Sequence, residues 1–237
     1  MANIVTLISN DAGSGNTTFA FNLGYTLKNL NAKILLVNFK YSPTYLNILK
    51  DPQIKLNSRN CISPFVVAEY DKRFQLLFLS NGKTSVNKSD YDKLLRKQIG
   101  LISKYFDFII FDASPTWTTL IQKALELSDQ VIPIYNINNF APTSLSKTLT
   151  IVRDAKNSNN NLKLKTIVLN GYDDKNQSHI NVMLQINKSI NKNYSFICLP
   201  FRENLVSINT NSIQYVKNNQ WDEYSLLLTK IANQLLK

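Results

Sequence analysis

The residues with the clearest capacity for chemistry lie in the stretch NDAGSGNTTFAFNLG, residues 10–24. Glycines at 13 and 15 would let the backbone curl so that successive N–H groups point inward, and a helix beginning beside Thr17 would add its positive end. A threonine at the first helical position is a magnesium ligand in such loops. The stretch therefore predicts a phosphate-binding loop, although Asn16 stands where the loop ordinarily has a lysine.

This loop requires a strand before it and a helix after it, and the rest of the chain repeats that alternation. The expected strands are 4–8, 33–39, 74–79, 106–111, 130–135, 164–169 and 195–199. The expected helices are 17–30, 86–104, 117–127, 141–156, 177–191 and 221–236. Continuous apolar runs separated by helices indicate an α/β fold, with a doubly wound, mostly parallel sheet and helices on both faces.

The domain organisation follows from what separates these elements. The sequence has no linker rich in proline or glycine and no internal repeat, so we expect a single domain over residues 1–237. Residues 51–73 form the least regular segment, and we expect an extended loop with short helical turns there.

The composition of the chain narrows the classes of function that it could have. A formal net charge of +11 favours a polyanionic partner, although a basic proteome would explain the charge as well. The apolar run at Ile4 is too short for a signal sequence, so a cytoplasmic location is expected. Cys61 and Cys198 lie too far apart in sequence to suggest a metal cluster or a disulfide framework. The single histidine, His179, falls in a polar stretch and is interpreted as a surface residue, which argues against histidine-based catalysis.

Several motifs in order resemble the ParA/MinD family of P-loop ATPases. The variant loop of that family reads K-G-G-x-G-K-T-T or -S, and this chain has D-A-G-S-G-N-T-T at residues 11–18. The further matches are FIIFDASP at 108–115 to the Walker B segment, DQVIPI at 129–134 to the next strand, LNGYD at 169–173 to the adenine-side loop and LPFR at 199–202 to the strand ending near the base. The resemblance covers nearly the whole chain and implies the P-loop fold.

The resemblance also implies a nucleotide site that takes ATP and magnesium, if nucleotide binding is retained. Its residues would be Asp11, Ala12, Gly13, Ser14, Gly15, Asn16, Thr17, Thr18, Asn170 and Pro200. Thr17 and Asp112 would hold the magnesium. Two simpler interpretations stay open, because a strand-terminal aspartate can cap the following turn and an asparagine before glycine is a turn former.

Departures from the family pattern predict weak catalysis. Asp11 and Asn16 replace both lysines of the loop, and residues 38–42 (NFKYS) replace a D-x-D-P-Q segment. Exchanging a cation for an anion about 4 Å from phosphate changes the interaction by several kcal/mol at an effective dielectric constant of about 20. Lys40, at the end of the second strand, is a candidate replacement for the missing charge and joins the nucleotide-site residues.

Family members of the ParA type bind DNA without sequence preference near their C-terminal helices. The cations in the corresponding part of this chain are Lys188, Lys192, Arg202 and Lys217, each of which could equally be an ordinary exposed residue. The last segment, 221–237, is amphipathic with few cations, so a helix packed on the sheet is favoured over a MinD-like membrane anchor.

The sequence therefore leads to one principal hypothesis and two alternatives, besides the less favoured MinD-like membrane-associated positioning ATPase. The principal one is a ParA-like homodimer that positions a plasmid, chromosome or other cargo over nucleoid DNA, with a ParB-like adaptor and impaired or absent ATP hydrolysis. The first alternative is a pseudo-ATPase that forms a constitutive dimer or scaffold without nucleotide. The second is an active ATPase with an unusual loop.

Overall fold

The computed structural model describes residues 1–9, 13–38, 55–57, 65–79, 88–113, 118–189, 194–205, 212 and 214–237. The strands are β1 (Asn3–Ile8), β2 (Ile34–Asn38), β3 (Lys55–Asn57), β4 (Phe65–Asp71), β5 (Phe74–Leu79), β6 (Phe108–Ala113), β7 (Gln130–Asn136), β8 (Lys163–Leu164), β9 (Thr166–Tyr172) and β10 (Ser195–Pro200). The helices are α1 (Asn16–Asn29), α3 (Lys88–Ile102), α4 (Thr118–Leu127), α5 (Pro142–Ser158), α6 (Gln177–Ser189), α8 (Tyr215–Asn218) and α9 (Glu223–Leu235). The predictions for Asp11, Ala12, Lys40, Cys61 and Lys192 lie outside the described residues.

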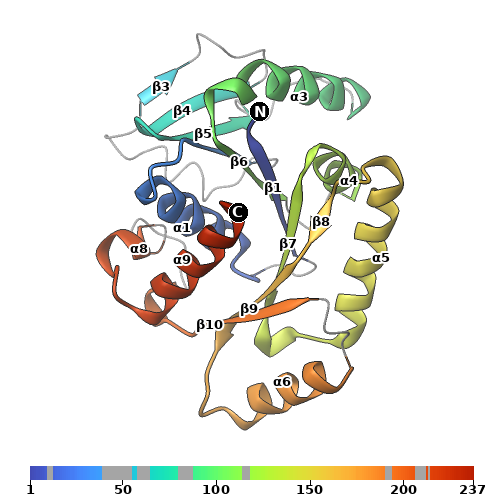
Figure 1. The fold of residues 1–237 in the computed structure, drawn as a ribbon, viewed down its shortest axis with the longest axis vertical. Helices are drawn as coiled ribbons and strands as arrows, with labels where there is room; N and C mark the ends of the chain where they lie inside the picture. Colours follow the sequence, from blue (N-terminus) through green and yellow to red (C-terminus); the bar gives the residue numbers. More distant parts are fainter. Residues whose placement is uncertain are drawn as a thin grey trace.

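The strands form one sheet in the order β10-β9-β7-β1-β6-β2-β5-β4-β3 (Figure 1). β1 lies near its middle and pairs in parallel with β6 and with β7. Pairing stays parallel from β10 across to β5, and β4 then pairs antiparallel with both β5 and β3. The expected fold, a mostly parallel sheet covered by helices, is confirmed.

Two apolar cores lie on opposite faces of this sheet, because successive strand residues point to opposite sides. In β2, Leu36 belongs to the core under α1 and α9, whereas Leu35 and Val37 belong to the core under α3, α4 and α5. Figure 1 shows α1, α8 and α9 gathered on one side of the sheet and α4 and α5 on the other. All residues of β2 and β6 are buried, which explains the continuous apolar runs ILLV and FIIF with which these strands begin.

The structure corrects the expectation of a loop over residues 51–73. β3 and β4 lie within this range, and β4 is joined to β5 by a tight turn at Lys72 and Arg73. The carboxylate of Asp71 accepts a hydrogen bond from the backbone N–H of Arg73 at 3.0 Å and thereby stabilises the turn. A charged two-residue turn gives no glycine signal for a hairpin, so the sequence pattern did not indicate it.

The structure also corrects the interpretation of His179 as a surface residue. His179 is only 4% exposed, and its Nδ1 accepts a hydrogen bond from the backbone N–H of Asp173 at 3.1 Å. Its Nε2 therefore donates to Oδ1 of Asn138 at 2.9 Å. The imidazole thus connects α6 to the segment after β9 and to the short helix at Ile137–Asn139. Separately, none of the helices in the described ranges has the length and apolarity needed to cross a membrane.

Candidate nucleotide site

The loop between β1 and α1 is built around two glycines with left-handed backbone. Gly13 has φ = 78° and Gly15 has φ = 85°, values that L side chains adopt only with strain. Gly15 is also close to β9, because a Cβ there would lie 2.2 Å from Nδ2 of Asn170. Gly15 precedes the first residue of α1, so the helix begins directly at the loop. The expected strand–loop–helix arrangement is present over the part that the structure describes.

Asn16, at the position of the missing lysine, is turned toward Asp112 at the end of β6. Its Nδ2 donates a hydrogen bond to Oδ1 of Asp112 at 2.5 Å, and the hydroxyl of Thr17 donates to Oδ2 at 2.7 Å. Asn16 is 8% exposed and Asp112 is 5% exposed. Oδ1 of Asn16 is buried and has no hydrogen-bond partner within the described part of the chain. Asn16 therefore supplies a neutral donor to a buried carboxylate in place of a cation.

A pocket of about 240 Å³ lies beside the loop, between the ends of β7, β9 and β10. It is lined by Gly13, Gly15, Thr18, Asn136, Asn170, Gly171, Pro200, Phe201, Arg202 and Leu205. Nδ2 of Asn170 donates to the carbonyl oxygen of Ser14 at 3.1 Å and joins the loop to β9. The structure thus brings Asn170 and Pro200 to the loop, although they lie far from it in sequence.

Four lining residues were not among the site residues predicted from sequence: Asn136, Gly171, Phe201 and Leu205. Asn136 is the last residue of β7, a parallel strand that pairs with β1. Ligands of open α/β sheets bind outside the carboxyl ends of such strands, so its position in the sequence was a usable signal. Gly171 and Phe201 lie within the LNGYD and LPFR segments that were matched from the sequence, so those segments were a usable signal, whereas no short motif marks Leu205.

The residues present fit a nucleotide phosphate and its magnesium only in part. The glycine conformations, the start of α1 and the pairing of Thr17 with Asp112 agree with a phosphate cradle and a set of oxygen ligands suited to magnesium. The cation that would contact the phosphates is absent at position 16, and the amide there is engaged with Asp112.

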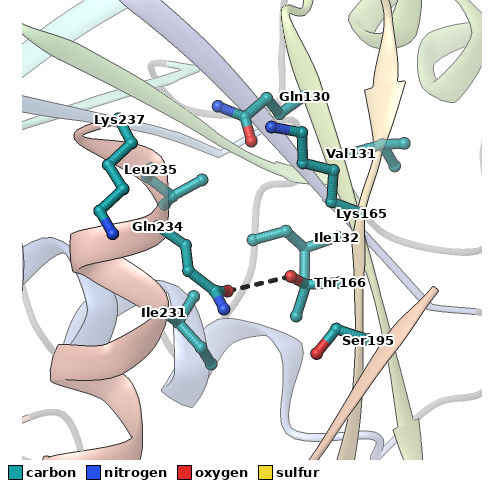
Figure 2. Close-up of a pocket in the computed structure, with 10 residues that line it drawn as sticks. All are labelled: Gln130, Val131, Ile132, Lys165, Thr166, Ser195, Ile231, Gln234, Leu235 and Lys237. Carbon is teal, nitrogen blue, oxygen red and sulfur yellow. Dashed lines mark hydrogen bonds between the residues drawn. The ribbon is translucent and has the colours of Figure 1, made fainter. Parts of the chain in front are cut away.

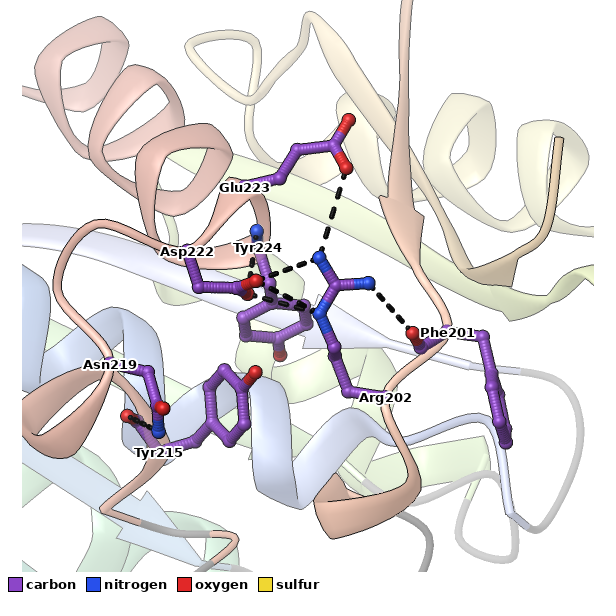
Figure 3. Close-up of polar contacts among 7 residues, drawn as sticks. All are labelled: Phe201, Arg202, Tyr215, Asn219, Asp222, Glu223 and Tyr224. Carbon is purple, nitrogen blue, oxygen red and sulfur yellow. Dashed lines mark hydrogen bonds and ion pairs between the residues drawn. The ribbon is translucent and has the colours of Figure 1, made fainter.

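Arg202, one of the predicted DNA contacts, is held in an ion pair (Figure 3). Its Nε lies 3.0 Å and its Nη2 lies 2.7 Å from Oδ2 of Asp222, and its Nη1 donates to the carbonyl oxygen of Phe201 at 2.8 Å. The hydrogen bond with Asp222 raises the pKa of the Arg202 guanidinium above its ordinary value. Asp222 also caps α9 by accepting from the backbone N–H of Tyr224 at 3.0 Å. The same carboxylate therefore links β10 to the start of α9.

The other predicted DNA contacts that the structure describes are exposed. Lys188 lies in the last turn of α6, and Lys217 lies in α8. Neither is ion-paired with a carboxylate among the described residues. Contact of these lysines and of Arg202 with DNA stays a prediction.

Comparison with known proteins identifies relatives of this chain. The AAA domain family model matches residues 77–166, which run from β5 to the first residue of β9. A ParA family protein of Mycoplasma pneumoniae is 22% identical over 236 residues, covering 88% of this chain and 84% of that protein.

Two solved structures share the fold along the whole chain. The cell division ATPase MinD of Pyrococcus furiosus is 17% identical with a TM-score of 0.70, covering 100% of this chain and 99% of that one. The putative plasmid partition protein of Borrelia burgdorferi bound to AMPPNP is 20% identical with a TM-score of 0.67, and the match covers 99% of this chain and 98% of that one. The resemblance to the ParA/MinD family of P-loop ATPases is thereby confirmed, and the chain has the fold of those proteins.

Proposed function

Because this chain has the ParA/MinD fold and a neutral residue at the phosphate-binding lysine position, we propose that it is a ParA-like partition or cargo-positioning protein with impaired or absent ATP hydrolysis. The Asn16–Asp112 hydrogen bond carries this proposal. A ParA family relative and a partition protein of the same fold support the partition role.

The residues of the site would hold a nucleotide by its phosphates. The loop around Gly13 and Gly15 and the amino end of α1 would surround the phosphate oxygens, and Thr17 and Asp112 would hold magnesium. Bound magnesium would neutralise phosphate charge. To reach a phosphate, Asn16 would have to give up its bond to Asp112, which leaves a buried carboxylate with one donor fewer.

The missing charge sets the size of the expected defect. A unit charge about 4 Å from a phosphate oxygen contributes about 4 kcal/mol at an effective dielectric constant of about 20. Since about 1.4 kcal/mol corresponds to a factor of ten in affinity, loss of this charge weakens phosphate binding by roughly a thousandfold. Phosphoryl transfer relies on such electrostatic stabilisation, so hydrolysis is affected together with binding.

The proposed partners are nucleoid DNA, a second copy of this chain and a ParB-like adaptor. The net charge of +11 supports electrostatic, sequence-independent DNA binding in the cytoplasm. Asp11 would face phosphate in a nucleotide-bound dimer, where a carboxylate is repulsive. A dimer that forms without nucleotide is therefore the alternative arrangement for this chain.

Phosphate release with saturating ATP and magnesium tests the proposal. The parent should release phosphate at the rate of the Asp112→Ala control, and Asn16→Lys should exceed both. A parent rate several-fold above the control would overturn impaired hydrolysis. Light scattering with and without ATP and magnesium addresses assembly, since a dimer that forms only with nucleotide would exclude the constitutive scaffold.

A further inference from the structure

The edge of the sheet opposite the loop carries a row of cations. This amino edge consists of the residues that directly precede or begin the parallel strands. Backbone hydrogen bonds of 2.7–2.9 Å join these residues in strand order across the sheet. From β5 to β1, the N–H of Ile34 donates to the carbonyl oxygen of Arg73, that of Asp107 to Lys33, and that of Asn3 to Asp107. From β1 to β10, the N–H of Asp129 donates to the carbonyl oxygen of Ile4, that of Lys163 to Asp129, and that of Ser195 to Lys165. Lys33 and Lys165, which precede β2 and β9, therefore lie in one row with Lys163, the first residue of β8.

The two aspartates of the amino edge direct their carboxylates to the backbone. Oδ2 of Asp107 accepts from the backbone N–H of Lys33 at 2.7 Å, and Oδ2 of Asp129 accepts from that of Ile4 at 2.8 Å. Lys33, Lys163 and Lys165 are exposed and form ion pairs with no carboxylate in the ranges that the structure describes. The cations at or beside this edge are Lys33, Lys72, Arg73, Lys104, Lys163, Lys165 and Lys237, and they outnumber Asp107, Asp129 and Asp71 of the hairpin turn, which is ion-paired with Lys28.

Two hollows flank the row, and each has lysines on its wall. The first, of about 310 Å³, is lined by Lys33, Lys72, Tyr105 and Phe106 among others. The ring of Tyr105 is 56% exposed, and Nζ of Lys104 lies 5.1 Å from its centroid. A basic wall with an exposed aromatic ring suits phosphate and sugar contacts.

The second hollow, of about 210 Å³, lies under the end of α9 (Figure 2). Its polar walls are Lys165, Lys237, Gln130 and Ser195, together with Thr166 and Gln234, which share a hydrogen bond of 3.2 Å. Nδ2 of Asn3 donates to the carbonyl oxygen of Leu235 at 3.3 Å and attaches the end of α9 to the start of β1. The two hollows therefore belong to the same edge, one on each face of the sheet.

Helix dipoles do not account for this arrangement. Cations in the last turn of a helix are stabilised by its negative end, which accounts for Lys104 in the short helix Ser103–Tyr105. Lys237 lies two residues beyond the end of α9. Lys33, Lys163 and Lys165 precede or begin strands, and Lys72 lies in a hairpin turn, where no such field acts. The field at a helix end therefore does not explain the presence of these four lysines at this edge.

We propose that the amino edge of the sheet binds the phosphates of duplex DNA without reading its sequence. This inference rests on the proposed function and assigns DNA binding to a surface other than Lys188 and Lys217. From β5 to β9 the edge spans five strand intervals, about 24 Å at about 4.8 Å each. A duplex has one charge per about 1.7 Å of its axis, so several phosphates face this length.

Two triple variants that each remove three positive charges provide the test. The edge variant is Lys33→Gln, Lys163→Gln, Lys165→Gln, and the matched control is Lys93→Gln, Lys147→Gln, Lys175→Gln, three lysines that lie neither at this edge nor among the DNA contacts predicted from the sequence. All six lysines are exposed, and none is ion-paired among the described residues. Thermal unfolding verifies that both variants fold. Fluorescence anisotropy with a labelled random-sequence duplex then gives the dissociation constant over a series of salt concentrations.

The edge variant should bind more weakly and its log–log salt slope should be smaller by about 3, since each phosphate contact contributes about 0.9. The control should stay close to the parent. Suppose that the parent binds the duplex and that the salt slope of the control decreases by at least as much as that of the edge variant. The inference about the amino edge is then wrong, while the proposed function stands. If the parent does not bind the duplex, both the inference and the proposed function are wrong. The same conclusion follows if the parent binds phosphatidylserine vesicles but not the duplex.

Discussion

The side-chain amide of Asn16 donates a hydrogen bond to the carboxylate of Asp112, and the hydroxyl of Thr17 donates to the other carboxylate oxygen. Position 16 follows the loop and position 112 ends β6, so this pair fixes the start of α1 against the sheet. A lysine at position 16 would bring charge to the phosphates. The asparagine instead stabilises the buried carboxylate.

Replacement of Asn16 by aspartate should destabilise the protein more than replacement by alanine. Alanine removes one hydrogen bond to a charged group, which costs about 1.5–3 kcal/mol. Aspartate is nearly isosteric with asparagine but places a second carboxylate against Asp112, which adds repulsion in a buried site. Urea unfolding of the two variants measures the difference, and equal stabilities would contradict the contact.

Gly15→Ala should destabilise the loop more than Gly13→Ala. Both glycines have left-handed backbone, so each alanine incurs about 1–2 kcal/mol of strain. A methyl group at Gly15 also displaces the amide of Asn170, whereas at Gly13 nothing lies within 4 Å of it. Thermal unfolding compares the two, and adding Asn170→Ala to Gly15→Ala should recover the part due to the clash.

Asn22→Ala should destabilise the protein by roughly 3–5 kcal/mol, because each buried polar group that loses its partner costs about 1–3 kcal/mol. The Asn22 side chain is fully buried and donates to the carbonyl oxygens of Thr18 at 2.9 Å and Ser212 at 2.8 Å. It also accepts from the backbone N–H of Val216 at 3.0 Å. Asn233→Ala, at an exposed position of α9, is the control and should leave the unfolding free energy nearly unchanged.

Stability should depend on the ionisation of Asp222. Burial alone would raise the pKa of this carboxyl, but hydrogen bonds from Arg202 and from the Tyr224 N–H outweigh it and hold the pKa below its ordinary value. The folded pKa is therefore lower than the unfolded value of about 3.9, so the stabilisation is present above about pH 4 and lost as pH falls through the folded pKa.

Asp222→Asn tests this sign. Relative to the parent, its deficit in unfolding free energy should be constant at neutral pH and should shrink below about pH 4. Asp154→Asn serves as the control, since Asp154 is 62% exposed and its contact with Arg153 is 3.5 Å long. A deficit that grows on acidification would contradict the assigned ion pair.

Cys198 should react slowly with thiol reagents. Burial raises the pKa of its thiol to about 11, whereas an ordinary cysteine has a pKa of about 8.5. At pH 8 the thiolate fraction is then lower by more than about 100-fold, and the thiolate is the reactive form. In a Cys61→Ser background, labelling of Cys198 should be more than about 100-fold slower in the folded protein than in urea. Equal rates would place Cys198 at an exposed position.

Local patterns predicted the regular part of the fold well. The helix expected at 17–30 is α1 (Asn16–Asn29), and the strand expected at 74–79 is β5. Such elements are readable because apolar periodicity and burial agree. β4 was not predicted, because Glu69 and Asp71 interrupt its apolar residues and its turn has no glycine.

The site was predictable where motifs mark it and not where side chains meet by tertiary contact. The sequence indicated the loop, Asp112 and Asn170, but not that Asn16 would bond to Asp112. Arg202 has its partner Asp222 twenty residues later, and an ion pair across that separation leaves no spacing signal. The burial of His179 was equally hidden, since the partners of its imidazole lie in separate segments.

The central place of β1 has a consequence for how the chain is made. β1 is synthesised before its parallel partners β6 and β7, which begin at Phe108 and Gln130. Until β6 has been synthesised, about 100 residues after β1, Val5 and Leu7 of the nascent polypeptide have no parallel strand on either side. Pairing of such sequence-distant strands is slow and leaves apolar surface open to aggregation. Chaperone protection is needed most during this interval of translation.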